Sequence, residues 1–194
     1  MRKLSFVTSV ALMGAVPLAL ASCTNTKSPD LCPQVAIMPG LESTVEFRPG
    51  MPPSPDNVLY VARLVAAKTQ CEVDKKTGAA TATVTLNMAT IRGGADIRKA
   101  TVSYFAAVAD EKQEILTKKN FLVSLDYPEK RPRIDITDEL TERVPVPKGK
   151  KANNYTLLLG FQLTPEQREF IQAQQEGGNS TPTNPNALFR KPGS

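Results

Sequence analysis

The sequence contains no histidine, and this absence removes several classes of enzyme at once. Serine and cysteine hydrolases of the triad type use an imidazole as general base. Ordinary zinc hydrolase sites also depend on imidazole ligands. None of these sites can be built from this chain.

Glycine and aromatic residues are sparse, but the start of the chain carries a strongly apolar run over residues 4–20. Arg2 and Lys3 precede this run, and it ends in Leu20-Ala21-Ser22-Cys23. The ending resembles the lipobox of bacterial lipoproteins. That resemblance implies cleavage before Cys23 and addition of a diacylglyceryl group to its thiol.

The alternative to a signal peptide is a transmembrane helix. Such a helix needs about 20 apolar residues, whereas this run is shorter and carries Pro17. We therefore predict a signal peptide over residues 1–22 and a lipid anchor on Cys23 that attaches the protein to a membrane of the cell envelope, facing the periplasm. Thr24, in place of aspartate, favours the outer membrane under enterobacterial-type sorting rules. Residues 23–31 form a short tether, so the domain should stay close to its membrane.

The chain has only three cysteines. With Cys23 assigned to the lipid, Cys32 and Cys71 remain as an even pair in an exported, oxidising setting. We predict a Cys32–Cys71 disulfide. A metal site is the alternative, but two thiols without histidine or CxxC spacing do not supply a ligand set, so no metal and no cofactor are expected.

The net charge is modest. It is +5 for the whole sequence, and loss of Arg2 and Lys3 with the signal peptide lowers it to +3. The basic residues are scattered in small groups and form no dense stripe of the kind that nucleic-acid binders display. We expect them to keep loops and sheet edges soluble; the alternative is a face that leans on anionic lipid. No nucleic-acid partner is expected.

The body of the chain shows repeated period-2 alternation, which is typical of half-buried strands. The clearest example has Ala82, Val84, Leu86 and Met88 on one side. In the predicted strand over residues 58–73, we expect one face to carry Val61, Val65, Cys71 and Val73. The predicted strands cover residues 35–38, 44–48, 58–73, 81–88, 102–108, 115–125 with a bend or bulge at 118–119, 133–137 and 155–163, with residues 144–147 as an edge or connector.

One helix is predicted near the C-terminus, over residues 165–175. Thr164 supplies an N-cap, Pro165 stands at the first helical position, and Gln167 follows three residues after the cap. Residues 177–194 are polar and rich in Gly, Asn and Pro, and we expect them to be disordered. Within this tail, Leu188, Phe189 and Arg190 are a candidate docking patch for a partner.

These elements predict an all-β protein: an antiparallel β-sandwich of immunoglobulin or fibronectin III architecture over residues 32–176, with one short C-terminal helix. The antibody-type tryptophan is absent. An eight-stranded barrel or lipocalin-like cup is the alternative. The stretch at residues 159–167 and the Cys32-Pro33 start are similar to uncharacterised envelope lipoproteins of Gram-negative bacteria, a resemblance that implies no particular activity.

One acidic cluster is the candidate for chemistry. Its four carboxylates could run glycoside hydrolysis or hold a cation, but arginines lie alongside as neutralising partners, and we interpret the cluster as a solvated turn. The cluster consists of Asp135, Asp138, Glu139 and Glu142. The segment at residues 92–96 lacks a P-loop pattern and is predicted to be a β-turn.

The hypothesis from the sequence is a non-catalytic, lipid-anchored binding or accessory subunit of a membrane-associated complex. Two alternatives remain open. One is a carrier of lipid or another hydrophobic ligand in a β-cup, and the other is an enzyme acting on envelope glycans. No catalytic residue is assigned.

Overall fold

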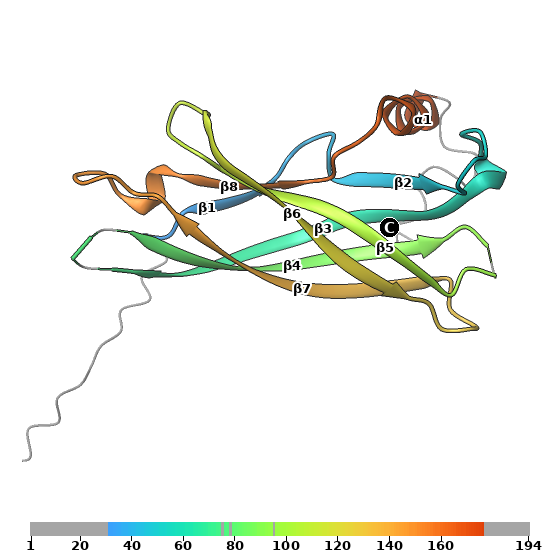
Figure 1. Ribbon diagram of the computed structural model, residues 1–194, viewed down its shortest axis with the longest axis horizontal. Coiled ribbons are helices and arrows are strands. Elements are labelled where there is room, and N and C mark those ends of the chain that lie inside the picture. Colours follow the sequence, from blue (N-terminus) through green and yellow to red (C-terminus); the bar gives the residue numbers. More distant parts are fainter. Residues whose placement is uncertain (1–30, 75, 78, 95, 177–194) are drawn as a thin grey trace, which may run out of the picture.

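The computed structural model describes residues 31–74, 76–77, 79–94 and 96–176, and these residues form two β-sheets packed face to face (Figure 1). The residues of the predicted lipobox and of the C-terminal docking patch lie outside this described part. The strands are β1 (Gln34–Ile37), β2 (Ser43–Phe47), β3 (Val58–Val73), β4 (Ala80–Arg92), β5 (Lys99–Ala109), β6 (Ile115–Asp126), β7 (Arg133–Val144) and β8 (Thr156–Gly160).

Each sheet has four strands. Sheet A has the order β1-β8-β5-β6, and sheet B has the order β2-β3-β4-β7. All neighbouring strands are antiparallel except β1 and β8, which pair in parallel. The described residues thus confirm the all-β sandwich, and the two separate sheets exclude the barrel alternative.

The space between the sheets is filled by side chains. The inward residues of β4 and β5 follow the alternation that the sequence predicts, because period-2 alternation places every second side chain on one face. The largest fully buried side chains include Tyr104, Phe161, Leu86, Met88, Leu125, Leu157 and Leu159.

A disulfide joins the two sheets at one end of the sandwich. Cys32, directly before β1 of sheet A, is bonded to Cys71 in β3 of sheet B, with 5.5 Å between the Cα atoms. The predicted pairing is confirmed. The bond ties sheet A to sheet B next to β1, which is only four residues long.

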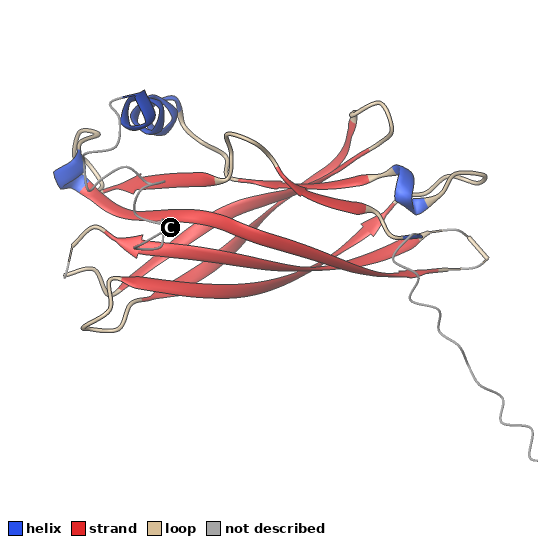
Figure 2. Cartoon of the chain, turned by 180° about the vertical axis from the view of Figure 1, so that it is seen from behind, coloured by secondary structure: helices blue, strands red, loops and turns tan. Residues whose placement is uncertain are grey.

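The C-terminal helix α1 (Pro165–Glu176) lies outside the sandwich next to β2 (Figure 2). Its start is fixed by the predicted capping box: Gln167 N donates to Thr164 Oγ1 at 3.2 Å, and Thr164 N donates to Gln167 Oε1 at 2.9 Å. Ile171 packs with Val45 and Val61 in a small second core. None of the helices in the described residues has the length and apolar character that a membrane span needs.

Strand β7 is longer than predicted. The sequence pattern predicts a short strand over residues 133–137 and a solvated turn for the acidic cluster. The structure continues the strand to Val144, with Leu140 and Val144 in the core. The alternation persists because both inward carboxylates find polar partners on sheet A.

Three further expectations need correction. Val65 is 58% exposed, because a register shift between Leu64 and Ala66 of β3 breaks the predicted face. Its supposed neighbour Val61 faces α1 and not the main core. The bend or bulge predicted at residues 118–119 of β6 is not there. The register shift between β5 and β6 lies at the step from Val108 to Ala109, opposite an earlier part of β6. The last strand, predicted over residues 155–163, covers only Thr156–Gly160.

Candidate functional site

An apolar hollow of about 310 Å³ opens on the outer face of sheet A, between the strands and the start of α1. We call it the sheet A hollow. It is lined by Met38, Leu41, Phe105, Ala107, Ile115, Lys118, Phe161, Gln162, Leu163 and Arg168.

The floor of the hollow exists because one position in β8 has no side chain. Gly160 pairs with Phe105 of β5. A Cβ atom on Gly160 would lie 3.0 Å from both Leu41 Cβ and Phe105 Cζ. The phenyl ring and Leu41 therefore pack directly onto the strand backbone. Beyond Gly160 the chain leaves sheet A, since Phe161 N donates to Leu41 O at 2.8 Å instead of continuing the pairing with β5.

The rim of the hollow is cationic. Lys118 Nζ lies 4.4 Å from the centroid of the Phe105 ring, a cation–π contact, and donates to Gln162 Oε1 at 3.3 Å. Arg168 projects from the first turns of α1 and is exposed. The lining contains no acidic residue, and among the described residues neither cation has an ion-pair partner. The hollow thus offers an apolar floor beside two positive charges.

A second hollow of about 320 Å³ lies on the other side of Gln162, between β2 and the first half of β5. We call it the edge slot. It is lined by Thr44, Glu46, Leu59, Tyr60, Ala100, Thr101, Val102, Ser103, Gln162 and Gln167.

Glu46 is the single charged residue among the described residues that line the edge slot. Partial burial raises the pKa of its carboxyl group, while a hydrogen bond from Gln167 opposes that rise. Burial also raises the pKa of Tyr60, which keeps its hydroxyl protonated. That hydroxyl donates to the carbonyl oxygen of Thr101 at 2.8 Å.

The acidic cluster lies on strand β7 and is not the solvated turn that the sequence suggested. Asp138 and Glu142 point inward, and Asp135 and Glu139 point outward. Tyr104 Oη donates to Asp138 Oδ2 at 2.7 Å, and Lys119 Nζ lies 2.8 Å from Glu142 Oε2. Within the described residues no group of acidic or sulfur side chains is arranged to hold a metal ion. The two inward carboxylates tie β7 to sheet A.

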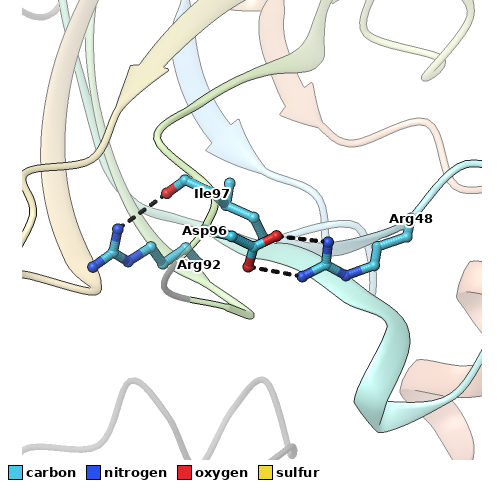
Figure 3. Close-up of polar contacts among 4 residues, drawn as sticks. All are labelled: Arg48, Arg92, Asp96 and Ile97. Carbon is cyan, nitrogen blue, oxygen red and sulfur yellow. Dashed lines mark hydrogen bonds and ion pairs between the residues drawn. The ribbon is translucent and has the colours of Figure 1, made fainter.

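The predicted turn at residues 92–96 lies where β4 ends, and the side chains of Arg92 and Asp96 hold the loop in place (Figure 3). Arg92 is buried and donates to the carbonyl oxygens of Ile97 at 3.0 Å and Glu129 at 2.6 Å. Arg48, just after β2, forms a two-pronged ion pair with Asp96 at 2.9 and 3.0 Å. This pair lowers the pKa of the Asp96 carboxyl. The arginines here are committed to holding a loop.

The structure brings together Cys32 and Cys71 of the predicted site residues. Cys23, Leu188, Phe189 and Arg190 lie outside the described residues, so their predicted roles stay predictions. Sequence reasoning missed both hollows. The available signal was the polar Gln162 beside Gly160 in an otherwise apolar final strand, which marks the point where the chain leaves the sheet.

Comparison of the chain with models of protein families, with curated proteins and with solved structures finds no match in any of the three.

Proposed function

We propose that this protein is a non-catalytic, lipid-anchored binding subunit of the cell envelope, and that the sheet A hollow is where it engages its partner. The partner is a protein segment that presents a large apolar side chain beside a carboxylate. The single observation that carries this proposal is the pairing of an apolar floor with Lys118 and Arg168 at the rim.

The charge pattern supports a carboxylate on the partner. The two cations have no acidic partner within the described residues, so an incoming carboxylate gains a charge-assisted contact without displacing an existing one. Rim charges of this kind contribute mainly to partner choice and to the rate of encounter.

The size of the hollow supports a protein side chain over a lipid. At about 310 Å³ it is at the low end of the range for ligand pockets and is open to solvent. The interior between the sheets, where a carrier would hold an acyl chain, is filled by residues such as Tyr104, Phe161 and Met88. These features favour docking over lipid carriage.

The inward carboxylates of β7 give little support to a glycan-acting enzyme. Paired carboxylates act on a substrate held between them. Here Asp138 and Glu142 are engaged by Tyr104 and Lys119. A role in sheet packing accounts for both.

A site-specific cross-linking experiment tests the proposal in cells. A photoreactive amino acid is placed at Ile115, which is 53% exposed at the rim of the hollow, and separately at Leu122, which is 75% exposed on the same strand outside it. We expect one envelope protein to be captured from position 115 and not from position 122.

Charge reversal identifies the contact. Lys118→Glu should lower capture from position 115 by roughly fivefold, equivalent to about 1 kcal/mol. Lys130→Glu, at an exposed lysine between β6 and β7 that lines neither hollow, should leave it unchanged. Equal capture from both positions, capture of lipid alone, or indifference to Lys118→Glu would contradict the proposal.

A further inference from the structure

Half of β5 has no neighbouring strand on one of its edges. β6 pairs with β5 along its whole length, from Lys99 to Ala109. β8 pairs only with the stretch from Phe105 to Ala109. Within the described part of the chain, residues 99–104 therefore have an open edge where β8 has turned away, and this edge forms one wall of the edge slot.

The backbone groups of Thr101 and Ser103 point into this slot. In an antiparallel strand, successive residues direct their N–H and C=O groups to opposite edges. Arg98 O accepts from Tyr127 N at 2.8 Å, and Asp110 N donates to Glu114 O at 3.0 Å, both on the β6 side. Even-numbered residues of β5 therefore face β6, and Thr101 and Ser103 face away from it.

The hydroxyl of Tyr60 supports this assignment independently. It reaches from β3 to the carbonyl oxygen of Thr101 across the slot at 2.8 Å. The described residues supply no other partner for the slot-facing N–H groups of Thr101 and Ser103 or for Ser103 O. An open, regularly spaced set of donors and acceptors is a template for strand addition.

We propose that an extended segment of a partner protein adds to sheet A at this edge, along residues 99–104 of β5, with a cationic side chain of the segment facing Glu46. Main-chain hydrogen bonds supply the binding and alternate side chains supply the choice of partner. Glu46 sets that choice because it is the single charge among the described residues lining the slot. This inference goes beyond the proposed function, since it concerns the edge slot and not the sheet A hollow.

Hydrogen exchange on the full-length lipidated protein in detergent micelles tests the proposal. The probe is a six-residue peptide of alternating valine and lysine with blocked ends. At about ten times its dissociation constant, it should slow exchange of the slot-facing amides of Thr101 and Ser103 about tenfold. A valine–glutamate peptide of the same length should not, and neither should the lysine peptide with N-methylated backbone, because it cannot form the ladder.

Matched variants assign the charge contact. Glu46→Gln should remove most of the preference for the lysine peptide, whereas Glu139→Gln, an exposed glutamate on β7, should retain it. Lys118→Glu should also retain it, which separates this inference from the proposed function.

Three results would overturn the inference. The first is unchanged exchange at residues 99–104 with every peptide. The second is equal slowing along the outer edges of β6 and β7, which would show adhesion without a site. The third is slow exchange at residues 99–104 in the peptide-free full chain that becomes fast when residues 177–194 are deleted, because the occupant would then be this chain's own tail.

Discussion

Lys119 of β6 reaches across the edge of the sandwich to Glu142 of β7, with 2.8 Å between Nζ and Oε2. The two ends differ in environment: the glutamate side chain is 3% exposed and the lysine side chain is 58% exposed. Glu142 Oε1 is buried with no hydrogen-bond partner among the described residues. The lysine is thus what makes a buried carboxylate tolerable at this position.

Removal of this lysine should destabilise the fold. Lys119→Ala leaves the buried Glu142 uncompensated, and we expect a loss of about 2 kcal/mol in the free energy of unfolding. Urea denaturation measures the loss. Lys99→Ala, which removes an ion pair exposed at both ends, should change stability by less than about 0.5 kcal/mol. Adding Glu142→Gln to Lys119→Ala should restore part of the loss; a further fall in stability would contradict this account.

The disulfide should contribute strongly because it closes a loop with a sequence separation of 39 residues. On the chain-entropy model, Cys32→Ser lowers the free energy of unfolding by about 4 kcal/mol. Cys71→Ser should give a similar loss, and the double variant no more than either alone. Chemical denaturation with and without reductant provides the measurement. If the reduced wild-type protein is as stable as the oxidised one, the disulfide does not contribute to the free energy of unfolding.

Gln167 has two roles, since it caps α1 and also donates through Nε2 to Val45 O at 2.7 Å. Gln167→Ala should therefore release the helix from β2 and speed amide exchange throughout α1, whereas Thr164→Ala removes only the cap, at about 1 kcal/mol. Gln172→Ala, on the exposed face of the same helix, is the control. Equal exchange in the Gln167 and Gln172 variants would show that the bond to β2 does not hold the helix.

Glu46 should make stability fall as pH rises. Burial raises the pKa of its carboxyl above the ordinary value of 4.5, so the folded state binds this proton more tightly than the unfolded state. The protonated Glu46 therefore adds to the free energy of unfolding below pH 4.5. This contribution is lost as the pH rises through the higher pKa that Glu46 has in the folded state. Glu46→Gln should flatten this part of the profile. Carbon-detected NMR titration of Glu46 gives the pKa directly; a pKa at or below 4.5 contradicts the prediction.

Lipidation at Cys23 should govern location and not folding. Cys23→Ala should shift the protein from the membrane to the soluble fraction and abolish metabolic labelling with a fatty-acid analogue. Its circular dichroism spectrum should match that of the wild type, because the described sandwich begins after this residue. An unfolded soluble form would show that the anchor and the domain are not separable, and unchanged labelling would locate the lipid elsewhere.

The sequence predicted the sandwich well where alternation is apolar and uninterrupted. Strand β3 was predicted with its correct bounds, and so was the start of α1, because local patterns decide both. β7 was cut short at Thr137 because the partners that permit an inward Asp138 and Glu142 come from β5 and β6, distant in sequence.

The candidate sites were beyond sequence reasoning for the same physical reason. The sheet A hollow depends on Phe105 lying on Gly160, and the open edge of β5 depends on where β8 departs. Neither property is local. The disulfide was predictable because only two cysteines remained once Cys23 was assigned, so no choice of pairing was left.

The parallel pairing of β1 with β8 sets the order in which the domain can be completed. Gln34 pairs with Thr156, so the first strand acquires its only strand neighbour within the described residues from almost the last part to be made. Local hairpins such as β3–β4 can form earlier, since contacts close in sequence cost less chain entropy to close. A chain that emerges from the ribosome N-terminus first therefore cannot complete the pairing of β1 until β8 has been made.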